Sequence, residues 1–315
     1  MSLKQSYDAI RQEIEKVVFG QDQVVELSMA ALFSCGHVLL EGPPGTAKTM
    51  LVKSIAAALQ LEWKRVQMTP DLLPGDITGS LVFNSTTDDF EFRQGAVFTN
   101  FLLADEINRS SARTQSALLE AMQELSVTYD KETHTLPSPF ITFATQNPVE
   151  TEGTYPLPLA QLDRFMFKVM VSYPDPGEED RILKEHHATS GSGKSLVSTI
   201  EPILDGQQLL AGREEIRNTI VRDEVISYVR RLIKATRDHD LISVGASPRS
   251  GLMLLMGAKS IARFQDRDFV VPDDIKYVFL PALRHRVVLS PTAQLEGMEA
   301  DQVLINILEA IEVPR

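Results

Sequence analysis

The order of apolar and polar positions divides the chain into a first part, where strand-like and helix-like segments alternate, and a second part that is nearly all helical. Short apolar runs predict strands at residues 38–41, 63–67, 101–104, 140–145 and 165–171. Apolar residues at helical spacing predict helices at residues 5–18, 23–34, 48–60, 111–124 and 178–188. Such alternation is typical of an α/β domain with a parallel sheet flanked by helices.

The composition changes near residue 190. Residues 189–198, TSGSGKSLVS, are interpreted as a linker, because their GSGKS lacks the preceding strand and first glycine of a phosphate loop. Predicted helices follow at residues 214–220, 224–237, 249–265, 272–284 and 300–310. We therefore expect an α/β domain over residues 1–190, then the linker and a smaller all-α domain over residues 191–315.

Residues 79–99, GSLVFNSTTDDFEFRQGAVFT, combine two β-rich runs with a polar turn at residues 84–89, which predicts an inserted hairpin. Its polar tip cannot bury enough apolar surface to belong to the core. We expect the hairpin to contact a partner and not the nucleotide, the alternative being a surface hairpin without a function.

The overall composition narrows the class of protein. The 315 residues are 43% apolar and 23% charged, as in soluble globular proteins. A net charge of −12 and a pI near 5.0 disfavour a nucleic-acid-binding protein. The single Cys35 excludes a disulfide framework and any multi-cysteine zinc site, and the six histidines are interpreted as surface residues. No apolar run reaches membrane-spanning length, so we expect a cytoplasmic protein without a membrane segment.

The most informative segment is HVLLEGPPGTAKT, residues 37–49, in which an apolar strand enters a Gly/Pro turn that ends in Lys48 and Thr49. Backbone N–H groups of such a loop, with the helix dipole behind them, hold polyphosphate. Lys48 is expected to reach the β- and γ-phosphates, and Thr49 to bind Mg²⁺. Ala47 replaces the usual glycine, and we expect the turn to accept its methyl group. The predicted nucleotide-binding residues of this segment are Gly42, Pro43, Pro44, Gly45, Thr46, Ala47, Lys48, Thr49 and Met50.

A second apolar strand, FLLADE at residues 101–106, ends in two adjacent carboxylates. Asp105 is predicted to hold Mg²⁺ through water, and Glu106 to polarise the water that attacks the γ-phosphate. A carboxylate pair at the surface is the alternative, but the phosphate loop that precedes it favours the catalytic interpretation. The sequence supplies no obvious cation for the γ-phosphate within one chain besides Lys48 and Arg249.

Over most of its length the chain resembles the MoxR family of AAA+ ATPases. The resemblance rests on GHVLLEGPPGTAKT (36–49), FLLADEINRSSARTQSALLEAMQE (101–124), FATQNP (143–148), LDRF (162–165) and GASPRS (245–250). It implies that Asn147 is the sensor-1 residue beside the γ-phosphate, that Arg164 is an arginine finger, and that Arg249 is the sensor-2 residue at the start of a lid helix. The same resemblance implies an adenine pocket lined by Gly20 and Gln21, with Val17 and Val18.

Each of these roles has an alternative that the sequence leaves open. Asn147 precedes a proline and could cap a turn. Arg164 could pair with its neighbour Asp163, and Arg249 could be a solvated residue at a frayed helix start. The segment with Gly20 and Gln21 could be a helix-breaking turn beside core valines.

The resemblance also implies what the protein does. ATP would bind between the α/β domain and the lid and be hydrolysed with Mg²⁺ at the interfaces of a homo-oligomeric ring, with a hexamer favoured. The ring would remodel or assemble partner proteins in a chaperone-like way, one such partner being a von Willebrand A domain protein. The hairpin at residues 79–99 would then contact a partner or line the pore of this ring. Two alternatives are a nucleic-acid motor of the MCM-like clade, which the acidic balance disfavours, and a nucleotide-gated scaffold without turnover.

Overall fold

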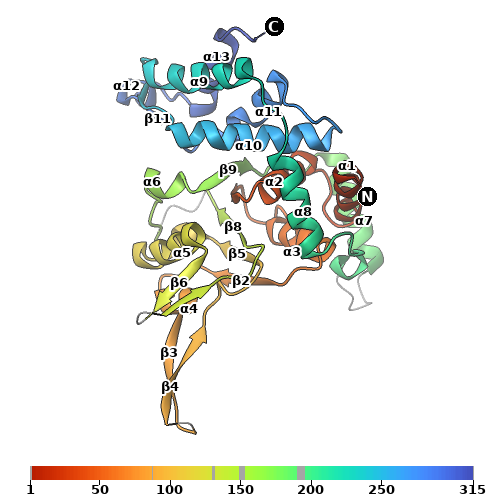
Figure 1. Ribbon diagram of the computed structural model, residues 1–315, viewed down its shortest axis with the longest axis vertical. Helices are drawn as coiled ribbons and strands as arrows, with labels where there is room; N and C mark the ends of the chain where they lie inside the picture. Colours follow the sequence, from red (N-terminus) through yellow and green to blue (C-terminus); the bar gives the residue numbers. More distant parts are fainter. Residues whose placement is uncertain (1, 87, 130–131, 149–152, 190–195, 315) are drawn as a thin grey trace.

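The computed structural model describes residues 2–86, 88–129, 132–148, 153–189 and 196–314. Residues 191–195 of the predicted linker, which include the GSGKS run, lie outside the described residues. The first part is an α/β unit and the second part is a helical lid above it (Figure 1).

A five-stranded sheet forms the centre of the first part, as the alternating pattern predicts. Its strand order is β2-β5-β8-β1-β9, and every neighbouring pair is parallel. The strands are β1 (His37–Glu41), β2 (Trp63–Gln67), β5 (Phe101–Asp105), β8 (Ile141–Gln146) and β9 (Phe165–Met170). Because they are parallel, the carboxyl ends of β1, β5 and β8 meet at one edge of the sheet, where the predicted motif residues follow.

Helices cover both faces of this sheet, which explains the continuous apolar runs of its strands. Alternate side chains of β5 enter different cores: Phe101 and Leu103 join one cluster, and Leu102 and Ala104 join the other. The first cluster includes residues of α1 (Leu3–Glu15), α2 (Asp22–Phe33) and α3 (Lys48–Ala58), and the second includes residues of α4 (Pro74–Thr78) and α5 (Ala112–Glu124). The described part of the domain also contains η1 (Ile107–Arg109), α6 (Leu159–Leu162) and α7 (Pro176–Thr189).

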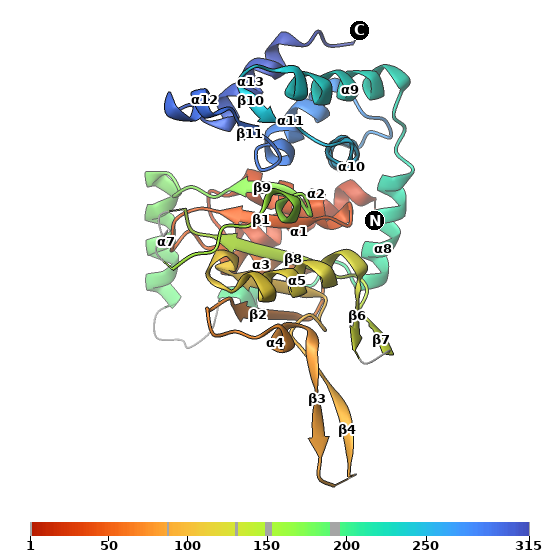
Figure 2. The ribbon, with the colours of Figure 1, turned by 90° about the vertical axis from the view of Figure 1, so that its left-hand side faces the viewer.

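The lid lies above β9 and α2 (Figure 2). Its helices are α9 (Asp223–Asp238), α10 (Pro248–Phe264), α11 (Pro272–Leu283), α12 (Pro291–Leu295) and α13 (Ala300–Ala310). It also contains a short antiparallel ribbon of β10 (Ile242–Val244) and β11 (Val288–Leu289), which the sequence did not lead us to expect. The segment before it forms η2 (Leu196–Thr199) and α8 (Gly206–Arg217), and α8 packs on α2.

Two antiparallel hairpins extend from the α/β unit. The first, β3 (Gly79–Asn84) with β4 (Asp89–Gln94), lies in the predicted interval and projects well beyond the body (Figures 1 and 2). The second, β6 (Ser126–Tyr129) with β7 (Glu132–Thr135), was not predicted. The ring of Phe92 stacks on His134 with centroids 4.1 Å apart, so the bases of the two hairpins are in contact.

Two histidines that we expected at the surface are buried, so that expectation is wrong for them. His37 lies at the start of the central strand β1, where its ring bonds to Met122 O and accepts from the N–H of Thr142. His285 lies in the lid, after α11, and donates to Phe165 O of the sheet. Strand and lid positions in the centre of the fold bury these rings, whatever their polarity. Across the described ranges, no helix combines the length and apolarity required to cross a membrane.

Candidate nucleotide-binding site

A cavity of about 540 Å³ lies at the carboxyl ends of the sheet strands. It is bounded by the loop after β1, the end of β5, the end of β8 and parts of the segments before α2 and around α7. The residues that line it are Val17, Phe19, Gln21, Pro44, Gly45, Thr46, Ala47, Lys48, Thr49, Met50, Arg65, Asp105, Glu106, Thr145, Asn147, Pro174 and Ile182. Its volume is in the range of small-molecule sites, roughly 300 to 1,000 Å³.

The loop between β1 and α3 owes its shape to backbone conformations that its small residues permit. Ala47 has φ 59° and Gly45 has φ 80°, so both occupy the left-handed region, and the loop accommodates the methyl group of Ala47. A Cβ at Gly42 would lie 2.1 Å from Val171 O, so close packing requires glycine there. Ala47 is the N-cap of α3 and makes no side-chain capping bond, which leaves the first N–H groups of that helix directed at the loop.

Lys48 holds its ammonium group inside this loop. Its Nζ donates to Gly42 O at 2.8 Å and to Pro43 O at 2.7 Å, with a longer bond of 3.3 Å to Thr46 Oγ1. Burial lowers the pKa of Lys48, whereas the nearby Asp105 and Glu106 carboxylates act to raise it. The charge of Lys48 is therefore placed where polyphosphate would meet the loop.

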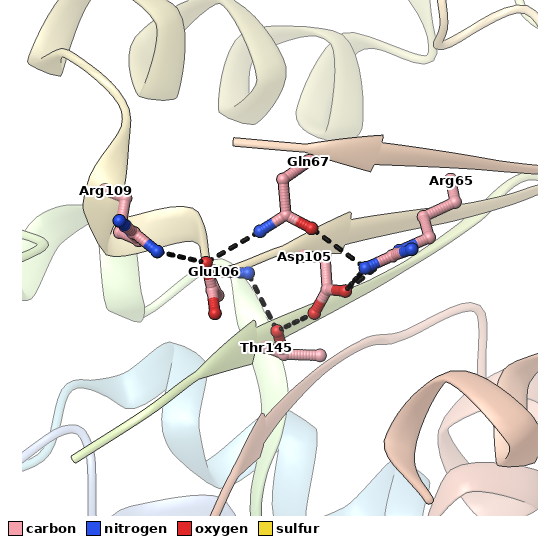
Figure 3. Close-up of polar contacts among 6 residues, drawn as sticks. All are labelled: Arg65, Gln67, Asp105, Glu106, Arg109 and Thr145. Carbon is pink, nitrogen blue, oxygen red and sulfur yellow. Dashed lines mark hydrogen bonds and ion pairs between the residues drawn. The ribbon is translucent and has the colours of Figure 1, made fainter. Parts of the chain in front are cut away.

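The two carboxylates predicted to act on water and metal are joined by Thr145 (Figure 3). The hydroxyl of Thr145 donates to Asp105 Oδ1 at 2.6 Å and accepts from the backbone N–H of Glu106 at 2.8 Å. Glu106 has φ 58°, a left-handed conformation that is uncommon outside glycine and is often seen at functional sites. Thr145 thus fixes the turn that carries both carboxylates.

Polar side chains of β2 occupy the other side of these carboxylates (Figure 3). Arg65 donates to Asp105 Oδ2 from Nε at 2.9 Å and from its terminal nitrogen at 2.7 Å. Gln67 donates to Glu106 Oε2 at 2.7 Å, and Arg109 donates to the same oxygen at 2.9 Å. Arg65 lines the cavity and is a cation there that the sequence did not indicate.

The residues predicted around the adenine are only partly at the cavity. Gln21 lines it and donates from Nε2 to Ser172 O at 2.9 Å. Val17 also lines it, whereas Val18 is buried in the core and Gly20 packs toward Glu178. Phe19, which was not predicted, lines the cavity as well. The adenine-pocket role of Val17, Val18, Gly20 and Gln21 remains a prediction.

Asn147, Arg164 and Arg249 occupy different positions relative to this cavity. Asn147 follows β8 and lines it. Arg164 lies between α6 and β9, where its Nε donates to Gln123 Oε1 at 3.0 Å, and Arg249 is exposed in the first turn of α10. Neither arginine lines the cavity of its own chain. Their roles as finger and sensor remain predictions.

Comparison with known proteins places the chain in a family. A family model described as "ATPase family associated with various cellular activities (AAA)" matches residues 37–167, and a model of the AAA lid domain matches residues 234–307. Chaperone MoxR1 of Mycobacterium tuberculosis is 41% identical over 312 residues, which cover 96% of this chain and 81% of that protein. The chain belongs to the MoxR family of AAA+ ATPases.

Two further relatives match this MoxR family chain along nearly its whole length. Protein YeaC of Bacillus subtilis is 43% identical over 303 residues, which cover 96% of this chain and 93% of YeaC. The crystal structure of a candidate ATPase from Cytophaga hutchinsonii superposes with a TM-score of 0.90 at 39% identity, covering 99% of this chain and 96% of that one. The sheet, the lid and their connection are therefore features of a known fold.

The donor set of this MoxR family chain fits a nucleoside triphosphate with Mg²⁺. Gly45 lines the cavity, and a Cβ added to it would meet no described atom within 4 Å, so there is open space beside the loop at this position. Thr49 and Asp105 would offer a hydroxyl and a carboxylate, the hard oxygen ligands that Mg²⁺ takes together with phosphate oxygens. Among the described residues, no cluster of three His, Cys, Asp or Glu side chains offers an all-protein metal site. Arg65 is already paired with Asp105, so Mg²⁺ would share or replace that cation.

Proposed function

We propose that this MoxR family chain hydrolyses ATP with Mg²⁺ at the interfaces between its subunits and uses the reaction to remodel or assemble partner proteins. The arrangement of Lys48, Asp105 and Glu106 around one cavity carries the proposal. A charged loop for phosphates after β1 and a fixed pair of carboxylates at the end of β5 are the parts that ATP hydrolysis requires.

Each residue has a defined task in this proposal. Lys48 and the N–H groups of its loop bind the β- and γ-phosphates, and Thr49 and Asp105 hold Mg²⁺, which neutralises charge on the phosphates when bound. Glu106 orients the attacking water and accepts its proton, with the amide of Asn147 beside it. Both bonds from Gln67 and Arg109 go to Glu106 Oε2, so at least one of them has to lengthen if that oxygen is to receive a proton.

The position of Arg164 supports an assembly of several subunits. Its guanidinium is bound to Gln123 on α5 and does not line the cavity of the same chain. An arginine that enters a neighbour's site stabilises the transferring phosphoryl group by a factor of about 10³ to 10⁵. We therefore propose a homo-oligomeric ring, with a hexamer favoured, in which Arg164 serves the next subunit and Arg249 acts from the lid.

The proposed partners are proteins. A relative that is 41% identical is named a chaperone. The hairpin of β3 and β4 projects from the body (Figure 2) and carries the exposed Phe83 and Phe90, which are not among the residues that line the nucleotide cavity. We propose that clients bind there, and that a von Willebrand A domain protein is one partner. The net charge of −12 disfavours the nucleic-acid motor, because a phosphate backbone requires a basic face.

A turnover assay with three arms tests this function. The purified chain is expected to hydrolyse ATP only with Mg²⁺, to lose turnover in Glu106→Gln, and to show no stimulation by double-stranded DNA. Stimulation by DNA would instead support the motor, and tight ATP binding without measurable turnover would support the nucleotide-gated scaffold. Capture of proteins by the Glu106→Gln chain then identifies the client.

A further inference from the structure

The lid arginine Arg286 is buried against the segment that carries Arg164. Arg286 is only 3% exposed and follows α11, while Arg164 lies between α6 and β9 in the α/β domain. The contact therefore joins the two parts of the chain at the residue predicted to act as the finger.

The guanidinium of Arg286 binds the backbone on both sides of Arg164. Its Nε donates to Asp163 Oδ1 at 2.6 Å, and one terminal nitrogen donates to Asp163 O at 3.0 Å and to Phe165 O at 2.6 Å. The other terminal nitrogen donates to Met166 O at 3.0 Å and to Ala282 O. These bonds match the five N–H donors of an arginine, and four of them go to residues 163–166.

A second lid residue binds the same backbone. His285 Nε2 donates to Phe165 O at 3.0 Å, so one carbonyl accepts from two adjacent lid side chains. Burial lowers the pKa of Arg286, and the Asp163 carboxylate opposes that shift. Two neighbouring lid side chains thus bind the backbone that flanks Arg164.

Burial of an arginine is costly unless every donor is satisfied. An apolar side chain of similar size could join lid and sheet without the desolvation free energy that a buried charge costs. It could not, however, hold four oxygen atoms of one turn in fixed positions. Among the described residues, Arg164 donates from Nε to Gln123 Oε1 and from its backbone N–H to Gln161 O at 3.2 Å. Arg286 thus adds four hydrogen bonds to the turn that carries Arg164, beside the pairing of Phe165 with His37 in the sheet.

We propose that Arg286 is a positioning residue for Arg164, through which the lid of one subunit sets the arginine presented to the next subunit. The inference rests on the proposed trans-acting role of Arg164. A movement of the lid would then act directly on the neighbouring site, because a displaced Arg286 shifts the turn on both sides of Arg164.

Turnover of mixed subunits tests this assignment. Arg286→Lys keeps the charge but loses the planar fork, so we expect kcat to fall on the order of 10- to 100-fold with little change in KM or in ATP affinity. Mixing with Lys48→Ala should restore part of the activity, because that chain brings an intact Arg164 to the intact cavity of Arg286→Lys. Mixing with Arg164→Ala should restore none, because neither chain then presents a working finger.

The controls separate the possible failures. Arg284→Lys, two residues away in the lid and paired with Asp301 at 2.8 Å, should turn over ATP at a rate close to that of the unaltered chain. Recovery of Arg286→Lys by Arg164→Ala, or wild-type turnover of Arg286→Lys, would overturn the positioning role. If instead Arg164→Ala and Lys48→Ala fail to complement each other while their subunits exchange, the proposed function itself is wrong. If Arg286→Lys fails to fold, Asp163→Asn replaces it in the same mixing experiments. That variant removes the charge with which Arg286 is paired.

Discussion

Thr145 donates a hydrogen bond of 2.6 Å to Asp105 Oδ1 and accepts one of 2.8 Å from the backbone of the next residue, Glu106. One buried hydroxyl thus orients the carboxylate assigned to Mg²⁺ and the turn that carries the carboxylate assigned to water. Removal of this hydroxyl would leave a buried acceptor and a buried donor without their partner.

Thr145→Val is therefore expected to slow ATP turnover by about tenfold and to lower the free energy of unfolding by about 1 to 3 kcal/mol. Steady-state kinetics and urea unfolding measure the two effects. Thr142→Val in the same strand is the matched control, because the buried hydroxyl of Thr142 has no hydrogen-bond partner among the residues that the structure describes. Equal effects of the two substitutions would show that the link from Thr145 to Asp105 contributes nothing specific.

Lys48→Ala and Glu106→Gln should fail in different ways. Lys48→Ala removes the charge that meets the β- and γ-phosphates, so ATP binding should be lost. Glu106→Gln removes only the group that positions water, so binding should persist while turnover stops. Calorimetry with ATP distinguishes them, and equal loss of binding in both variants would make Glu106 a structural carboxylate.

The exposed end of the first hairpin should matter for partners and not for hydrolysis. Phe83 and Phe90 are 52% and 61% exposed and contact each other edge to face, with ring centroids 5.4 Å apart. Changing both to serine should leave basal ATPase unchanged and weaken capture of client proteins. Phe92→Ser at the hairpin base should by contrast destabilise the fold, because that ring packs on Phe98 and His134. A loss of basal ATPase in the double variant would place the tip in the catalytic machinery.

Acid should destabilise the fold through His37. Burial lowers the pKa of His37 from its ordinary 6.5 to about 4, although the bond to Met122 O opposes the shift. The unfolded chain then binds a proton that the folded chain excludes, so stability is complete above pH 6.5 and falls as the pH drops toward 4. The loss attributable to His37 is at most about 3 kcal/mol.

Urea unfolding of the unaltered chain and of His37→Gln at pH 7, 5.5 and 4.5 measures this contribution. The variant should be less stable at pH 7, because its amide does not reproduce the imidazole contacts, yet lose less stability on acidification. Parallel pH profiles for the two chains would show that His37 does not titrate with folding.

The sheet and the motif residues at the ends of β1 and β5 could be predicted because each lies within one continuous segment. Arg65 and Gln67 could not, since nothing near them in the sequence indicates that β2 pairs with β5 and brings Gln67 opposite Asp105. Strand order depends on packing of the whole domain and not on local pattern. For Thr145 a signal was available, because it lies two positions before Asn147 and so faces the same side of the strand.

Some missed elements also had local signals. The start of α8 carries a capping box in which Asp205 accepts from the backbone of Gln208, a pattern of Asp followed three residues later by Gln. The hairpin of β6 and β7 is rich in threonine around a short polar turn. The contact of Arg286 with the turn at Arg164 has no such signal, because 121 residues separate Phe165 from Arg286.

The central claim, that hydrolysis takes place between subunits, is tested most directly by mixing Arg164→Ala with Lys48→Ala. Alone, Arg164→Ala should fold and bind ATP almost normally but hydrolyse it at least about 10³-fold more slowly, and Lys48→Ala should not bind ATP. Mixed, the two should regain part of the activity, because an intact cavity of one chain meets an intact arginine of the other. If labelled subunits exchange and activity still does not return, Arg164 does not act across an interface and the account is contradicted.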